Sequence, residues 1–140
     1  MDTGPVRVLV VDDQLPFRRA VRAVLGAMSE FELVGESTSG EEAVSAASTL
    51  RPDLVLMDVH MTGLDGIEAT RLIAAERPAT MVVLVSSYRA EDLAAAVAES
   101  GAFAFLPKDR FGASAIRELW SSRARSAAPT DTRARPSPDG

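Results

Sequence analysis

The stretch RVLVVDDQ, residues 7–14, carries β-branched and leucine side chains directly into two adjacent carboxylates, Asp12 and Asp13. An uninterrupted apolar run of this kind favours a strand that is buried on both faces. Taken alone, the two aspartates have a simple explanation, because Asp is common in turns and at helix N-caps. Similar runs recur later in the chain and end in Asp58, Ser86 and Lys108. The repetition predicts one shared site rather than a set of unrelated turns.

The composition limits the classes of protein and partner to consider. With 140 residues, of which 46% are hydrophobic and 25% charged, the chain has the size and balance of one folded domain. The net charge of -5 argues against a broad binding surface for nucleic acid. We therefore expect no direct nucleic-acid partner.

The chain has no cysteine and a single histidine, which excludes disulfides, thiolate metal sites and multi-histidine sites. Any bound metal ion must therefore be held by oxygen ligands. The N-terminal residues lack the pattern of a signal peptide, and no apolar stretch approaches the roughly 18 residues of a membrane-spanning helix. We expect a cytoplasmic protein without a membrane partner.

Apolar β-branched runs alternate with Ala-rich amphipathic stretches, which is typical of a parallel sheet covered by helices. The predicted strands are Val6–Val11, Phe31–Glu36, Asp53–Met57, Met81–Val85 and Ala102–Leu106. The second strand contains acidic residues and is expected at an edge, whereas the first, third and fourth are uniformly apolar. We predict an α/β fold: a doubly wound five-stranded parallel sheet of order 2-1-3-4-5 with helices on both faces.

The predicted helices lie between these strands. The first begins near Pro16, which suits a first helical turn, and the last begins near Ala113. The others span about Gly40–Thr49, Gly66–Glu76 and Glu91–Ser100. Helical spacing turns these side chains inward: Phe17, Val21, Val24, Leu25 and Met28 in the first helix, and Ile67, Leu72 and Ile73 in the third. Ser39 and Glu42 match the spacing of a capping box at the second helix.

The C-terminal segment differs in composition from the rest of the chain. Residues 121–140 are rich in Pro, Ser, Ala and Arg and show no apolar stripe, so we predict a disordered tail. The folded domain is expected to span residues 1–120, with its core in 5–120. No output domain is expected after it.

In a sheet of this order, the carboxyl ends of the first, third, fourth and fifth strands lie along one edge, where ligands bind. Three carboxylates, one hydroxyl and one ammonium would therefore share a crevice. Neighbouring acids raise one another's pKa unless a cation neutralises them. Mg²⁺ fits this set, since it takes oxygen ligands and relies on one or two carboxylates together with phosphate oxygens. The residues thus indicate a Mg²⁺-dependent site at which an aspartate accepts a phosphoryl group.

The motifs VLVVDDQ, LVLMDVHMTGLDGIEATR, VVLVSSY and GAFAFLPKD occur in this order at the predicted strand ends. In this set the chain resembles the receiver domain of bacterial two-component response regulators, over about residues 5–120. The resemblance implies a CheY-like, flavodoxin-like fold. The form of GAFAFLPKD resembles the receivers of NarL/FixJ-type regulators, which usually carry a helix-turn-helix output domain. Thr62 and Asp109 depart from the family pattern, because many receivers have Pro at these positions.

The resemblance also implies roles for the acidic residues. Asp58 is the implied phosphoacceptor, and Asp13 is the implied direct Mg²⁺ ligand. Asp12 is a second acid that acts mostly through metal-bound water. The backbone carbonyl of His60 is a further ligand, whereas its side chain is expected to point outward from a loop.

The remaining implied roles belong to the last two strands. Ser86 and Lys108 would contact the phosphoryl group, with Ser87 as the alternative for the serine. Phe105 would be an aromatic switch that turns inward as Ser86 moves. The simpler alternative for Phe105 is an aromatic that only packs on the core. The implied output is a change in the surface formed by the fourth helix, the fifth strand and the fifth helix.

A receiver of this kind catalyses only its own phosphorylation and dephosphorylation. Its implied partners are a sensor histidine kinase or phosphotransfer protein and an unknown downstream protein, and a second copy of itself after phosphorylation is compatible with the resemblance. Tyr88 is expected to shield the phosphoaspartate from water.

Two other functions are compatible with part of the pattern. A small phosphohydrolase with an aspartyl-phosphate intermediate is disfavoured because its second acid follows two residues after the nucleophile of the first strand, where this chain has Gln14. A flavin-binding module is disfavoured because the loop after the first strand is acidic and lacks a hydroxyl-rich phosphate cradle.

Overall fold

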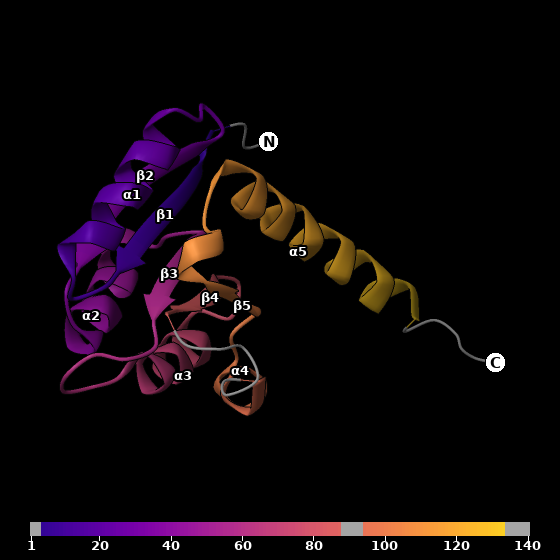
Figure 1. Cartoon of the computed structure of the whole chain (residues 1–140). Coiled ribbons are helices and arrows are strands. Elements are labelled where there is room, and N and C mark those ends of the chain that lie inside the picture. The colour runs from indigo at the N-terminus through magenta and orange to yellow at the C-terminus, as the bar shows by residue number, and fades with distance from the viewer. Residues whose placement is uncertain (1–3, 88–93, 134–140) are drawn as a thin grey trace.

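The computed structural model describes residues 4–87 and 94–133 of the chain. Its centre is a parallel sheet with strand order β2-β1-β3-β4-β5, as predicted (Figure 1). The strands are β1 (Val6–Val11), β2 (Phe31–Ser37), β3 (Leu54–Asp58), β4 (Met81–Ser86) and β5 (Ala104–Pro107). The predicted boundaries are the same for β1 and differ by at most two residues at either end of the other strands, and β2 lies at an edge.

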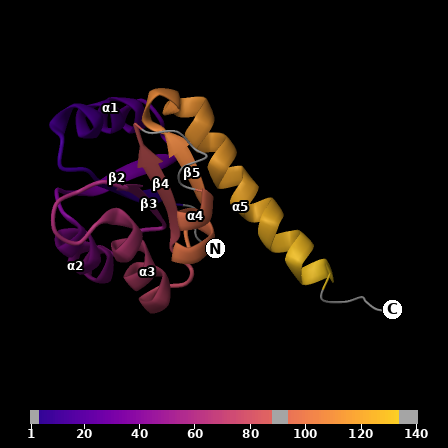
Figure 2. The ribbon, with the colours of Figure 1, turned by 60° about the horizontal axis from the view of Figure 1, so that its bottom comes forward.

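The helices cover both faces of the sheet (Figures 1 and 2). They are α1 (Leu15–Gly26), α2 (Gly40–Leu50), α3 (Gly66–Glu76), α4 (Ala94–Ser100) and α5 (Ala113–Arg133), with a short 3-10 turn, η2 (Lys108–Arg110), between β5 and α5. Helices α1 and α5 pack on one face, and α2, α3 and α4 pack on the other. The predicted arrangement of helices is therefore confirmed.

The strand sequence explains why two hydrophobic layers form. Along β1, Val8 and Val10 join the layer under α1 and α5, whereas Leu9 and Val11 join the layer under α2 and α3. All four side chains are fully buried. Because alternate residues of a strand point to opposite faces, a strand between two helical layers must be apolar throughout.

One predicted core residue was wrong. Leu72 in α3 is 43% exposed, whereas Ile73 is buried and Ile67 is partly buried. The buried stripe of α3 runs through Gly66, Ala69, Thr70 and Ile73. Leu72 lies one residue off this stripe, about 100° around the helix, and therefore faces solvent. The prediction placed it in the core because its side chain is large and apolar.

Helix α5 runs further than predicted. It continues to Arg133 and projects away from the sheet (Figures 1 and 2). The prediction of a disordered tail from Ser121 was therefore wrong for residues 121–133. Ala and Arg are good helix formers, so a helix can continue there without an apolar face. Within the described parts of the chain, no helix is both long enough and apolar enough to cross a bilayer.

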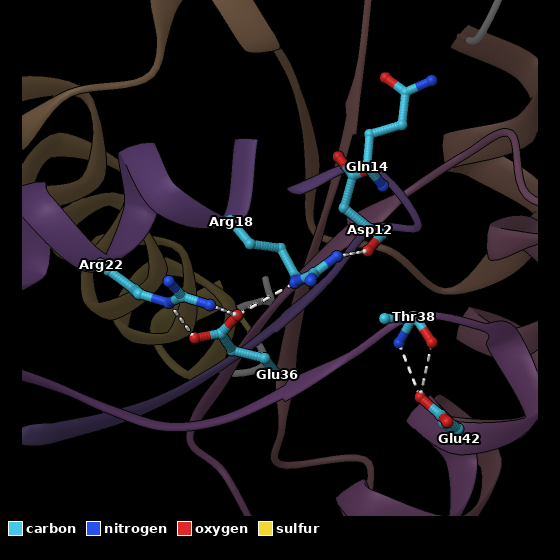
Figure 3. Close-up of polar contacts among 7 residues, drawn as sticks. All are labelled: Asp12, Gln14, Arg18, Arg22, Glu36, Thr38 and Glu42. Carbon is cyan, nitrogen blue, oxygen red and sulfur yellow. Dashed lines mark hydrogen bonds and ion pairs between the residues drawn. The ribbon is translucent and has the colours of Figure 1, made fainter. Parts of the chain in front are cut away.

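Capping groups define where the helices begin. The Ser39 hydroxyl accepts the backbone N–H of Glu42 at 3.1 Å, as the predicted capping box requires. The Glu42 carboxylate accepts from the N–H and hydroxyl of Thr38 instead of closing the box on Ser39 (Figure 3). Asp65, which the sequence analysis did not single out, caps α3. The predicted start of α4 near Glu91 lies outside the described residues.

Gly66 allows α3 to begin directly against the end of β3. A Cβ atom at this position would lie 1.9 Å from the carbonyl oxygen of Asp58. A hydrogen bond holds the two segments at this distance: the N–H of Gly66 donates to the carbonyl of Val59 at 3.1 Å. No side chain could fit here without moving the backbone that carries Asp58.

Gly66→Ala is therefore expected to lower the free energy of unfolding by about 3 kcal/mol, as measured by urea denaturation. Gly26→Ala is the matched control, because a Cβ at Gly26 would meet nothing within 4 Å. The control should unfold at the same urea concentration or a higher one. Equal destabilisation of both variants would contradict this account of Gly66.

Candidate functional site

The site is built where β1, β3, β4 and β5 end at the same edge of the sheet. The register aligns Asp58 with Val85, and Ser86 with Pro107. Asp12 follows β1, and its N–H donates to the carbonyl of Ser37 on β2 at 3.0 Å. The parallel pairing therefore brings together residues that are far apart in the sequence.

Three carboxylates gather at this edge, as the sequence predicted. One carboxylate oxygen from each of Asp12, Asp13 and Asp58 lies within 4.8 Å of the other two. Asp12 and Asp58 are buried, and Asp13 is exposed. Two negative charges are thus removed from water and a third lies at the mouth of the site.

Lys108 supplies the positive charge that faces this cluster. Its Nζ lies 2.6 Å from Oδ2 of Asp12 and 3.4 Å from Oδ1 of Asp58. The ammonium also lies 5.3 Å from the centre of the Phe17 ring, which Phe111 contacts edge-on. A lysine over an aromatic face is held partly by the ring quadrupole, so Phe17 helps to place the charge. The sequence analysis assigned Phe17 only to the core.

The environment of Asp58 raises its pKa to about 6. Burial is the main cause, and the charge of Asp12 adds to it. Lys108 and the backbone N–H of His60, which donates to the carboxylate, lower the pKa but do not offset these effects. The described residues alone therefore do not fully compensate the ionised cluster.

A cavity of about 140 Å³ opens beside the cluster. It is lined by Asp13, Gln14, Asp58, His60, Ser86, Ser87 and Lys108. The cavity contains all but two of the residues predicted for the site, the exceptions being buried Asp12 and Phe105. Gln14 was not predicted to belong to the site, and Ser87 was named only as the alternative to Ser86, although both directly follow a predicted site residue in the sequence.

The residues present fit a divalent cation with oxygen ligands. Oδ2 of Asp12 is buried and has no partner in hydrogen-bond geometry within the described chain, so its ion pair with Lys108 is its compensation. Adjacent carboxylates supply the hard oxygen donors that Mg²⁺ prefers. The pKa of Asp58 is raised first by burial and then by the charge of Asp12, so a nearby cation would favour its ionised form.

The loop between β1 and α1 is held by side chains of its neighbours (Figure 3). Oδ1 of Asp12 accepts the N–H of Gln14 at 2.9 Å, and Nη1 of Arg18 donates to the carbonyl of Asp12 at 2.8 Å. Gln14 is the N-cap of α1, and no side chain caps this helix. The simple explanation of Asp12 and Asp13 as helix caps is therefore wrong.

A side chain of α2 holds the loop that follows Asp58. The carboxylate of Glu41 accepts the N–H of Leu64 at 3.1 Å, and Gly63 has a φ of 77°, in the left-handed region that glycine adopts readily. Thr62, where many receivers have Pro, is exposed in this loop. The loop is thus fixed by a hydrogen bond and a glycine without the proline.

Phe105 lies on β5 and does not line the cavity in the described structure. It is partly buried and packs on the layer beneath α2, α3 and α4. The next residues, Leu106 and Pro107, lead into the turn that carries Lys108. Every peptide bond of the described residues is trans, including those around Pro107.

This geometry agrees with the comparison with known families. A family model for the response regulator receiver domain matches residues 8–119. The chain belongs to this family. Receiver domains accept a phosphoryl group in two-component signalling, and this chain carries such a domain.

Similar receiver domains occur in proteins with different names. The receiver is 39% identical over 103 residues to the transcriptional regulatory protein LiaR of Bacillus subtilis, covering 74% of this chain and 49% of LiaR. It is 44% identical over 104 residues to a protein-glutamate methylesterase/protein-glutamine glutaminase of Pseudoalteromonas translucida, covering 74% of this chain and 27% of that protein. The chain therefore spans about half or less of the length of these curated relatives.

Solved receiver structures support the fold. The signal receiver domain of the putative response regulator NarL from Mycobacterium tuberculosis has a TM-score of 0.76 and 28% identity, over 90% of this chain and 98% of that one. The response regulator domain of Thermotoga maritima CheB has a TM-score of 0.73 and 29% identity, over 84% and 95%. The flavodoxin-like prediction is confirmed.

The pKa of Asp58 predicts how pH affects the metal-free receiver. Since the pKa is raised in the folded state, the folded state binds the proton more tightly, and this stabilisation is present below about pH 4 and lost as the pH rises through about 6. Asp58→Asn should therefore raise the free energy of unfolding by about 1 kcal/mol at neutral pH in EDTA. The difference should shrink at about pH 4, as measured by urea denaturation.

Asp109→Asn is the control for this measurement, because Asp109 is exposed and does not line the cavity. It should change stability little at either pH. A gain in stability from Asp109→Asn as large as that from Asp58→Asn would mean that overall charge, rather than the buried cluster, causes the effect.

Proposed function

We propose that Asp58 accepts a phosphoryl group in a Mg²⁺-dependent reaction. Asp13 and Asp58 would bind the ion directly, together with the backbone carbonyl of His60. Asp12 would act mostly through water on the ion. The observation that carries this proposal is the cluster of three carboxylates within 4.8 Å that a single ammonium faces.

In the proposed reaction, a carboxylate oxygen of Asp58 forms a bond to phosphorus while the bond between phosphorus and the donor breaks. The leaving group departs with the electron pair, as acetate does from acetyl phosphate. A bound Mg²⁺ would neutralise charge on the phosphoryl oxygens. Asp58 suits the role of nucleophile because its carboxylate lies at the cavity wall, where a phosphoryl group can reach it.

Lys108 and Ser86 are proposed to contact the phosphoryl group once it is transferred. Lys108 already lies 3.4 Å from Asp58, and Ser86 lines the same cavity at the end of β4. A phosphoryl group adds roughly two negative charges to the site. Movement of these two side chains toward it would couple the charge to the ends of β4 and β5.

The same movement is proposed to change the surface formed by α4, β5 and α5, with Phe105 as the aromatic switch. Phe105 is two residues before Pro107, which pairs with Ser86 in the sheet. A shift of Ser86 would therefore also move the paired end of β5, two residues from Phe105. Tyr88, proposed from the sequence to shield the phosphoaspartate, lies outside the described residues.

A sensor histidine kinase or phosphotransfer protein is the proposed phosphodonor. A groove of about 470 Å³ adjoins the site and shares Gln14, Ser87 and Lys108 with it. Pro16, Phe17 and Ala20 give this groove an apolar wall from α1. A donor protein seated there could present its phosphoryl group to Asp58. We further propose a cytoplasmic location, an unidentified downstream protein and no turnover of external substrates.

The first test is the intact mass of the protein after incubation with acetyl phosphate and Mg²⁺. We expect a gain of about 80 Da in the wild type, and no gain in Asp58→Asn or when EDTA removes the metal. Asp109→Asn should gain mass like the wild type. Absence of an adduct with release of inorganic phosphate would indicate a phosphohydrolase, and absence of both would contradict the proposal.

A second test separates the two effects of Lys108. Its charge repels a cation at the acidic cluster but attracts the phosphoryl group. Lys108→Met should therefore bind Mg²⁺ more tightly, by about threefold in calorimetry, yet form the 80 Da adduct at least about tenfold more slowly. Weaker Mg²⁺ binding by this variant would contradict the proposed placement of the charge.

A further inference from the structure

Arg18 connects three parts of the chain at the edge of the acidic site (Figure 3). It belongs to α1, its Nη1 donates to the backbone carbonyl of Asp12, and its Nε pairs with Oε1 of Glu36 on β2 at 3.0 Å. Its side chain is only 14% exposed. The helix dipole disfavours a cation near a helix N-terminus, so these contacts, rather than the helix, account for its position.

Glu36 is itself held by a second arginine. Arg22, one turn further along α1, donates from Nε to Oε2 of Glu36 at 2.5 Å and from Nη2 to Oε1 at 3.0 Å. These hydrogen bonds lower the pKa of Glu36, with Arg22 as the main cause, so the carboxylate stays ionised. Within the described residues, Arg22 thus contacts the same carboxylate as Arg18 but makes no hydrogen bond to the loop that carries Asp12 (Figure 3).

The carbonyl that Arg18 holds belongs to the peptide between Asp12 and Asp13. A peptide unit is planar, so fixing its oxygen also fixes the direction of the following N–H and the position of the next Cα. The remaining restraints on Asp12 are its N–H bond to Ser37, the bond from Gln14 to its carboxylate and the ion pair of that carboxylate with Lys108. None of these contacts restrains the carbonyl, and α1 has no side-chain cap.

We propose that Arg18 is a positioning residue of the cation site: by holding the Asp12 carbonyl, it sets the relative orientation of the Asp12 and Asp13 carboxylates. This inference rests on the proposed Mg²⁺ site. Glu36 keeps the guanidinium in place from the other side, so the edge strand β2 takes part in forming the site. Arg18 touches neither the cation nor the phosphoryl group in this role.

The geometry distinguishes this role from a simple electrostatic one. A lysine at position 18 would keep the charge, but one ammonium cannot reproduce the planar fork that serves the Asp12 carbonyl and Glu36 together. If orientation matters, Arg18→Lys should behave much like Arg18→Ala. If only charge matters, Arg18→Lys should behave like the wild type.

The test is calorimetric titration of the metal-free protein with Mg²⁺, with no phosphodonor present. Arg18→Ala and Arg18→Lys should each raise the Kd for Mg²⁺ by about tenfold, the scale of effects from groups that orient metal ligands. Arg22→Ala is the matched control, because it removes an arginine from Glu36 and leaves the Asp12 carbonyl held. It should change the Kd by less than about twofold.

Phosphorylation by acetyl phosphate supplies an independent readout. In Arg18→Ala, the Mg²⁺ concentration for half-maximal adduct formation should rise about tenfold, while the rate at saturating Mg²⁺ stays within about twofold of the wild type. A merely structural defect would lower the saturating rate instead. Circular dichroism establishes folding, and if Arg18→Ala does not fold, Arg18→Lys and Glu36→Gln carry the test, each with weaker Mg²⁺ binding than Arg22→Ala.

The outcomes distinguish a failure of the positioning role of Arg18 from a failure of the proposed phosphoacceptor function. Wild-type affinity in Arg18→Lys, or equal losses in the Arg18→Ala and Arg22→Ala variants, would overturn the positioning role while leaving the phosphoacceptor intact. A wild type that neither binds Mg²⁺ nor gains mass would instead overturn the proposed function.

Discussion

Mutual repulsion among three carboxylates at one edge of the sheet is the constraint around which the rest of this receiver is arranged. Asp12 and Asp58 are buried, and a single nearby ammonium, that of Lys108, cannot balance the whole cluster. The pKa of Asp58 is raised to about 6, mainly by burial and further by the charge of Asp12. A site of this kind gains affinity for a cation from this imbalance, and a bound cation would in turn offset the negative charge that a phosphoryl group adds.

Such a cluster persists only because the scaffold beneath it is rigid. The strands that carry it are buried on both faces between two helical layers. The packing is also close at the C-terminal end of β3, because there is no room for a side chain at position 66 beside the Asp58 carbonyl. The packing of the core thus offsets the unfavourable energy of holding like charges close together, which is typical of sites that must bind charged ligands.

The arginines of α1 illustrate how similar ion pairs differ in effect. Both Arg18 and Arg22 contact Glu36, but the Arg22 side chain is 48% exposed, and an ion pair so open to water contributes little to stability. Arg18 differs because it also donates to a backbone carbonyl beside two site carboxylates. Its value therefore lies in geometry rather than in Coulomb energy, and the same reasoning applies to Glu41, which holds the loop after Asp58 by one backbone N–H.

The sequence by itself determined the strand order, the covering of both sheet faces by helices and the identity of Asp12, Asp13, Asp58, Ser86 and Lys108 as neighbours. These follow from local patterns: apolar runs define buried strands, and a parallel sheet brings their carboxyl ends to one edge. Only the tertiary structure decided the contacts of Arg18 with Glu36 and the Asp12 carbonyl, the Phe17 ring against Lys108, the exposure of Leu72 and the length of α5. Each of these depends on which side chains from distant elements meet, or on where a helix stops without an apolar stripe to mark it, and no local pattern of residues specifies either.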